Sequence, residues 1–321
     1  MSRRLRIAVV AAVALAAAGG VALGAVLVGG DENGSKRPSG PPPFVVDLGV
    51  RTDAEAAALR SAARAYNGGD RGRAGRILAG RTSIQALIGS ALASWPAGSL
   101  ARLEQLAQTN PGSGAALFHL GLARYWETDT EGALEAWRAT RARAPDSAYA
   151  IRATDLLFRR FPPGQPTFIP SFRADRSVTR LGPAAQLAAL ARNARRRDAR
   201  AKLLYGLALQ RLERPISARR QYTAAARLAP RNPEALAADA VGRFDKAHPE
   251  RAFSRLGPLT RRFPKAATIR FHLGVLLLWL GQLDEARRQL RIAAGMTRSP
   301  LAGEANRLLD RLEDVGKPND E

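Results

Sequence analysis

The sequence predicts an all-α fold: an α-solenoid of repeated helical hairpins, preceded by one N-terminal transmembrane helix. Three observations predict it. From residue 52 onward, apolar residues recur at spacings of three and four, with breaks at Gly or Pro about every dozen residues. One set of residue types returns at intervals of 34 residues. Residues 7–28 contain neither a charged residue nor a proline.

The first element is the apolar segment near the N-terminus. At about 1.5 Å per residue, residues 7–28 reach roughly 33 Å as a helix, enough to cross a hydrocarbon core. Arg3, Arg4 and Arg6 precede it, so the positive-inside tendency places the N-terminus in the cytoplasm. We expect a cytoplasmic tail at 1–6, a transmembrane helix at 7–30, and a single-pass protein of the cell membrane whose C-terminal domain is extracytoplasmic.

Two alternatives stay open for this segment. Ala16-Ala17-Ala18 offers a small-x-small site typical of a cleaved signal peptide, although the apolar run continues past it. Gly20 and Gly24 form a G-x-x-x-G pair through which two such helices would approach and form a homodimer. Chance also produces this spacing in a segment so rich in Ala and Gly.

Residues 31–52 form the next element, a stretch rich in Gly, Ser and Pro. Pro41-Pro42-Pro43 favours extended polyproline geometry. We interpret 31–52 as a linker that acts as a spacer between the membrane anchor and the domain that follows.

The repeat begins after the linker. Two units share every interval: the first contains Leu120-Gly121, Ala133, Trp137 and Pro145, and the second contains Tyr205-Gly206, Ala218, Tyr222 and Pro230. Gly and Ala allow the two helices of a hairpin to approach, a bulky residue fills the space between neighbours, and Pro ends the second helix. The frame predicts repeats that start near Gly80, Gly114, Ala199, Pro233 and Ala267.

The interval between the starts at Gly114 and Ala199 is 85 residues, which exceeds two repeats of 34 by 17. We therefore expect one repeat, with helices at 148–161 and 183–197, to contain a long insertion at 162–182. A hairpin at 53–80 would open the array, and a helix at 301–315 would close it.

This pattern resembles the tetratricopeptide repeat (TPR) family over roughly residues 80–300. The unit at Pro233 departs from it, with Asp239-Ala240 where a large residue and Gly belong. The resemblance implies a TPR-like solenoid over 53–316, followed by a tail at 317–321. It also implies a protein-binding scaffold, resembling membrane-anchored bacterial TPR proteins, and not an enzyme.

The residues offer little for chemistry. The chain has no cysteine, which excludes disulfides and thiolate ligands. Its three histidines, His119, His248 and His272, form no H-x-x-x-H pair, and no nucleotide-binding or nucleophile motif is present. His119 and His272 occupy the same frame position, so we interpret them as structural. We expect no catalytic residue, no metal and no cofactor.

Family geometry implies that the first helix of each hairpin lines a concave groove. The predicted groove residues are Phe118, Leu122, Tyr125, Leu203, Leu207, Gln210, Phe271, Val275 and Leu278. They are mostly apolar, which favours an amphipathic helix or a hydrophobic peptide as ligand. The alternative is that a segment of the same chain fills the groove, with Phe168 and Phe172 of the insertion as candidates.

The formal charge of +22 raises a second function class. The most basic stretch contains Arg192, Arg195, Arg196, Arg197 and Arg200. Such a surface attracts anionic polymers of the cell wall or nucleic acid, although the lack of stacking aromatics does not favour nucleic acid. The leading hypothesis is a membrane-anchored protein–protein interaction scaffold of the bacterial envelope, and the alternative is a binder of anionic polymer.

Overall fold

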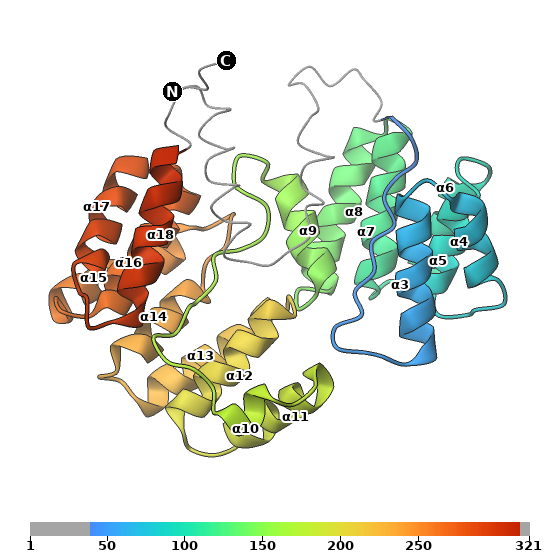
Figure 1. The fold of residues 1–321 in the computed structure, drawn as a ribbon. Helices are drawn as coiled ribbons and strands as arrows, with labels where there is room; N and C mark the ends of the chain where they lie inside the picture. Colours follow the sequence, from blue (N-terminus) through green and yellow to red (C-terminus); the bar gives the residue numbers. More distant parts are fainter. Residues whose placement is uncertain (1–38, 315–321) are drawn as a thin grey trace. The chain divides into compact units, whose positions relative to one another are not determined.

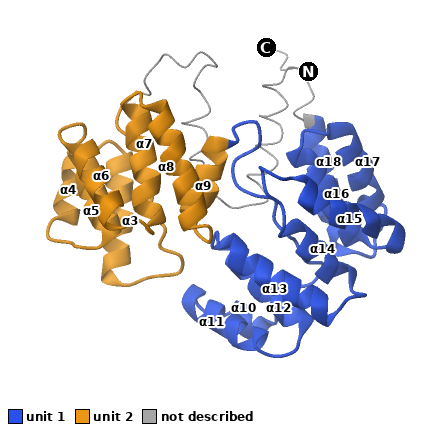
Figure 2. Ribbon diagram, turned by 180° about the vertical axis from the view of Figure 1, so that it is seen from behind, with its two compact units in different colours: residues 1–22, 158–321 blue, residues 23–157 orange. Residues whose placement is uncertain are grey.

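The computed structural model describes residues 39–314, which form two compact units. Residues 39–157 make up the N-terminal unit and 158–314 the C-terminal unit, drawn in orange and blue in Figure 2. The predicted tail 1–6, helix 7–30 with its G-x-x-x-G pair, and tail 317–321 lie outside the described residues. Within residues 39–314, no helix combines the length and apolar character that a membrane span requires.

Every regular element in residues 39–314 is helical (Figure 1). The N-terminal unit contains α3 (Ala54–Asn67), α4 (Arg71–Leu78), α5 (Ile84–Ala93), α6 (Ser99–Thr109), α7 (Gly114–Trp126), α8 (Thr130–Arg143) and α9 (Ala148–Leu157). The C-terminal unit contains α10 (Arg176–Thr179), α11 (Pro183–Ala194), α12 (Ala199–Arg211), α13 (Pro215–Leu228), α14 (Pro233–Val241), α15 (Glu250–Arg262), α16 (Ala267–Trp279), α17 (Leu283–Ala294) and α18 (Pro300–Asp314).

Consecutive helices pack as hairpins, which gives a TPR-like fold. Helices α7, α12, α14 and α16 begin at the residues that the 34-residue frame predicts, whereas α5 begins at Ile84, a turn later than expected. We call α3, α5, α7 and α9 the first helices of the N-terminal unit, and α12, α14 and α16 those of the C-terminal unit.

Local signals explain where these helices begin. Asp53, Ser83 and Ser113 cap α3, α5 and α7, each accepting a hydrogen bond from the N–H three residues ahead. Pro215 and Pro233 stand in the first turns of α13 and α14, where a missing N–H costs nothing.

The turn inside a hairpin needs a left-handed residue. Gly281 supplies it between α16 and α17, with φ +70°. The corresponding positions in two other hairpins are Thr128 and Glu213, with φ of +67° and +58°. The hairpin geometry therefore overrides the ordinary preference for glycine at this position.

Glycines at one frame position let the paired helices approach closely. A Cβ added at Gly121 would lie 2.4 Å from Trp137, and at Gly206 it would lie 2.5 Å from Tyr222. Trp137 and Tyr222 are fully buried in the space that these glycines leave. The predicted close approach at Gly, with a bulky residue filling the space beside it, is therefore confirmed.

The structure differs from the predicted array at the insertion. Helix α9 packs on α7 and α8 in the N-terminal unit, whereas α11 packs on α12 in the C-terminal unit. These two helices do not form one interrupted repeat, because each covers the apolar face at the end of a different unit. Residues 162–182 therefore belong to the C-terminal unit, in which they precede α11.

Replacing Gly206 by Ala should lower the free energy of unfolding by about 1–3 kcal/mol, because the new Cβ overpacks against the buried Tyr222 ring. Gly303→Ala is the matched control, since a Cβ there meets only the end of Arg307 at 4.0 Å. It should stabilise α18 by roughly 0.5–1 kcal/mol. Urea unfolding measures the free energy of unfolding of both variants. Equal effects would contradict the close approach of α12 and α13 at Gly206.

Candidate functional site

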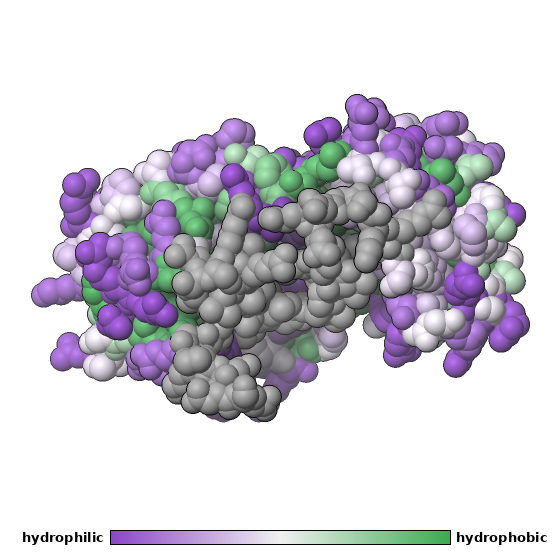
Figure 3. Space-filling model, turned by 90° about the horizontal axis from the view of Figure 1, so that it is seen from above, coloured by the Kyte–Doolittle hydropathy of each residue, from purple (hydrophilic) through white to green (hydrophobic). Residues whose placement is uncertain are grey.

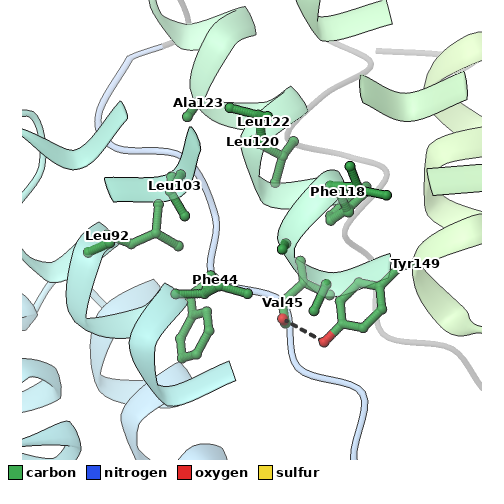
Figure 4. Packing of buried hydrophobic residues seen from close by; sticks show 14 of the residues in the cluster. Phe44, Val45, Leu92, Leu103, Phe118, Leu120, Leu122, Ala123 and Tyr149 are labelled. Atoms are coloured by element: carbon green, nitrogen blue, oxygen red, sulfur yellow. Dashed lines mark hydrogen bonds between the residues drawn. The ribbon is translucent and has the colours of Figure 1, made fainter. Parts of the chain in front are cut away.

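An extended segment, residues 40–48 (strap 1), lies across the first helices of the N-terminal unit. Phe44 and Val45 are 1% and 4% exposed, so the strap is part of the core of this unit. Figure 4 shows Phe44 on the side of Leu92, and Val45 on the side of Tyr149. The Tyr149 hydroxyl donates to the Val45 carbonyl at 3.4 Å.

Side chains from all four first helices hold the backbone of strap 1. On α3, Tyr66 Oη donates to Pro42 O at 2.9 Å, and Asn67 accepts from Phe44 N at 3.0 Å and donates to Phe44 O at 2.9 Å. On α5, Gln85 Oε1 accepts from Asp47 N at 3.1 Å. From α7 and α9 come bonds from Trp126 Nε1 to Gly40 O (2.9 Å) and from Asp47 N to Tyr149 Oη (3.1 Å). The N–H of Val45 donates to Nε2 of His119 in α7 at 3.1 Å.

A second extended segment, residues 162–172 (strap 2), lies across the first helices of the C-terminal unit. Phe168 is fully buried. Gln210 of α12 donates through Nε2 to Pro166 O at 3.0 Å and accepts at Oε1 from Phe168 N at 3.2 Å. His272 Nε2 of α16 accepts from Ile169 N at 2.9 Å, and Glu234 Oε1 of α14 accepts from Ser171 N at 3.3 Å. The buried Lys246 donates to the Pro162 carbonyl.

The two histidines play the same role in the two units. Nδ1 of His119 lies 2.7 Å from the Ala115 carbonyl, and Nδ1 of His272 lies 2.7 Å from the Thr268 carbonyl. A carbonyl only accepts, so Nδ1 carries the proton and Nε2 is left as the acceptor for the strap N–H. Each histidine therefore bridges its own helix to the strap as a neutral imidazole.

Burial keeps both imidazoles neutral. Desolvation lowers the pKa of His119 to about 4, and the hydrogen bond to the Ala115 carbonyl opposes this shift. Desolvation likewise lowers the pKa of His272 to about 4. In the C-terminal unit, burial also raises the pKa of Glu234, whereas the hydrogen bonds from Ser171 lower it. The strap contacts are thus made in a largely water-free environment.

Each strap inserts one phenylalanine between aromatic rings. The Phe168 ring stacks on His272 at a centroid distance of 5.0 Å and meets Tyr222 edge-on at 5.6 Å. The Phe44 ring lies 5.9 Å from that of His119 and 6.1 Å from that of Tyr66. Such pairs add specificity to the apolar area that each ring buries.

The structure places the predicted groove residues on the first helices. Phe118, Leu122, Leu203, Phe271 and Leu278 are buried, and Tyr125, Leu207, Gln210 and Val275 are half-buried. Gln210 touches strap 2 directly through both ends of its carboxamide. Binding of an external partner at these residues stays a prediction.

The segment predicted as an insertion does reach the first helices, which was the second of the two alternatives. Phe168 enters the core, whereas Phe172 stays half-buried with the Arg200 guanidinium 4.7 Å above its ring. Strap 1 differs from the prediction, because part of the presumed spacer is buried. The missed signal is a shared pattern: Pro42-Pro43-Phe44-Val45 and Pro166-Thr167-Phe168-Ile169 both read Pro-x-Phe followed by a β-branched residue.

The predicted basic patch lies at the end of α11 and the start of α12, and Arg192, Arg195, Arg196, Arg197 and Arg200 are all exposed. Arg200 also donates to the Arg173 carbonyl at 2.8 Å, which ties the patch to the segment that follows strap 2. Within the described residues, no group of three or more His, Asp or Glu side chains is arranged to hold a metal ion.

No protein-family model and no curated protein sequence matches this chain. Among solved structures, the chain is similar to a tetratricopeptide repeat protein from Parabacteroides merdae, with 13% identity and a TM-score of 0.35, covering 80% of this chain and 98% of the other. It is also similar to the TPR2AB domain of yeast Sti1 in complex with pHSP90, with 12% identity, a TM-score of 0.30, and coverage of 80% and 97%. With TM-scores this low, the assignment of a TPR-like fold rests on the hairpins of the chain itself.

Lowering the pH should destabilise both units. In the unfolded chain histidine takes up a proton near pH 6.5, whereas folded His119 and His272 stay neutral down to about 4. Their contribution is complete above about pH 6.5 and is lost as the pH falls toward 4, by about 3 kcal/mol for each histidine.

Urea unfolding across this pH range tests the linkage. The double variant H119Q/H272Q should be less stable at pH 7 but show a shallower pH dependence than the wild type. H248Q, which changes an exposed histidine whose ring lies beside Glu250, should keep the wild-type profile. Equal slopes for the wild type and the double variant would contradict the role of the buried imidazoles.

Proposed function

We propose that this chain is a non-catalytic protein-interaction scaffold, anchored to the bacterial cell membrane by residues 7–30, with the TPR-like units outside the cytoplasm. One observation carries the proposal: in both units, first helices hold an extended polypeptide segment through side chains that bond to its backbone. Recognition of backbone N–H and C=O groups together with one apolar anchor is the chemistry of peptide binding.

The remaining surface supports this assignment. Hydrophilic side chains dominate the visible face of the described residues in Figure 3, and apolar areas are small and interrupted. Among the described residues, the large exposed hydrophobics are Leu87, Leu181 and Ile292. Leu87 lies on α5, Leu181 in the connection between α10 and α11, and Ile292 on α17. By contrast, apolar side chains of the first helices, such as Phe118 and Phe271, are buried within the two units.

The runner-up function is binding of an anionic polymer through the basic patch. Five exposed arginines at the junction of α11 and α12 favour it, because phosphate-rich or carboxylate-rich polymers bind such surfaces by releasing counterions. This mode is steeply weakened by salt, whereas binding through apolar contacts and buried hydrogen bonds is not.

Crosslinking and affinity capture of the full chain from native membranes distinguishes the two. We expect a protein that remains bound when the salt is raised to about 0.5 M and whose crosslinks map to first helices, because salt screens only exposed charges. The control variant R195S/R196S/R197S should capture the same protein. Salt-labile polymer alone, lost in that variant, would overturn the scaffold proposal in favour of the runner-up.

Deleting residues 2–30 should move the protein from the membrane fraction to the soluble fraction. The reason is that residues 7–28 supply the uncharged run that the proposed anchor needs. Circular dichroism of the shortened chain controls for folding of the two units. A shortened chain that folds and still sediments with membranes after a salt wash would contradict anchoring by this segment.

A further inference from the structure

We propose that the first-helix face of the N-terminal unit is a recognition site for extended segments of the form Pro-x-Phe-(Val/Ile). Strap 1 is its resident ligand, and a partner protein that carries such a segment displaces it. The proposal rests on the proposed scaffold function and names the class of partner that this site takes.

Two straps with different neighbours in the sequence are held by the same contacts. The carbonyl of the first residue accepts a side-chain hydrogen bond, to Pro42 from Tyr66 and to Pro166 from Gln210. The N–H of the phenylalanine donates to a carboxamide oxygen, at 3.0 Å for Phe44 and 3.2 Å for Phe168.

The next N–H completes the shared set. It donates to the Nε2 atom of a buried histidine, at 3.1 Å from Val45 and 2.9 Å from Ile169. Three backbone contacts and one ring thus recur at the first, third and fourth residues of the motif, in the same order in both straps. Because two separate segments present the same backbone groups to equivalent side chains of the first helices, the first-helix face defines a binding motif.

The residue types of the motif suit this recognition. Proline has no N–H and favours extended geometry, so it leaves no unsatisfied donor and is already shaped for the site. Phenylalanine fills a space built for a ring: a Cβ on Gly89 of α5 would come within 2.6 Å of Phe44 Cζ. A β-branched residue at the last position also favours an extended backbone.

Strap 1 is placed to leave its site. It continues into α3 through residues 49–52, which are mostly exposed and include Gly49 at φ +52°. Rotation in this short hinge would free the strap without unfolding α3. While the strap is bound, its covalent attachment gives it an effective concentration in the millimolar range, so a competing segment binds weakly until the strap is loosened.

The test measures binding of a labelled peptide with the sequence of residues 39–50 to the full chain by fluorescence anisotropy. In the variant F44A, the strap loses its ring but the site keeps every group that recognises the peptide. We expect the peptide to bind this variant on the order of tenfold to a hundredfold more tightly than the wild type. The same peptide with Ala at the phenylalanine should show no such gain.

A second variant keeps the test independent of how F44A folds. V45P retains the ring but removes the N–H that His119 accepts, and should also expose the site to the peptide. Adding N67A to F44A should reduce binding again, because Asn67 makes both bonds to the phenylalanine backbone. Helicity and urea unfolding verify that each variant is folded.

The proposal is overturned if F44A and V45P are folded and either bind the peptide no more tightly than the wild-type protein does, or bind it no more tightly than they bind the Ala-containing peptide. That result would leave the scaffold function intact, since capture from native membranes reports binding through any part of the chain. If capture fails but the variants bind the peptide tightly, the motif recognition stands and the scaffold function in those membranes is contradicted.

Discussion

The hydrogen bond from a strap N–H to a buried neutral histidine is the interaction on which each unit depends. A backbone N–H buried without a partner costs about 1–3 kcal/mol, so an extended segment enters a helical core only where side chains accept its donors. His119 and His272 do this with Nε2 because the helical carbonyl one turn earlier holds their proton on Nδ1. The helix thus fixes the tautomer, and this tautomer leaves Nε2 free of a proton to accept the hydrogen bond from the strap N–H.

The straps in turn complete the packing of the helices. The first-helix faces are apolar, and a hairpin array cannot leave such faces in water without losing the stability that burial provides. Phe44 occupies the space that Gly89 leaves open, and Phe168 covers Tyr222, which itself fills the gap at Gly206. Each unit is therefore a helical array together with its own extended segment, and neither part accounts for the core alone.

The hairpins were predictable because their signals are local. Gly121 with Trp137 and Gly206 with Tyr222 recur at a fixed interval, and caps such as Ser113 mark the helix starts. The straps were harder to predict because they dock by tertiary contact, without any period. Val45 and His119 are 74 residues apart, whereas Ile169 and His272 are 103 apart, since α10 and α11 intervene before the first helices of the C-terminal unit. A search for fixed spacing therefore passes over both.

The difference between local and tertiary signals also explains why the histidines were predicted to be structural while their hydrogen-bond partners on the straps were missed. Their equivalent frame positions were visible in Phe118-His119 and Phe271-His272, and repetition alone is consistent with packing. A histidine that faces only other helices finds no backbone N–H for its Nε2 to accept from, because the backbone donors inside helices are already paired. A buried imidazole repeated at one frame position of a first helix is therefore a signal that an extended segment crosses that helix, and the place to seek the segment is a Pro-x-Phe stretch outside the helical period.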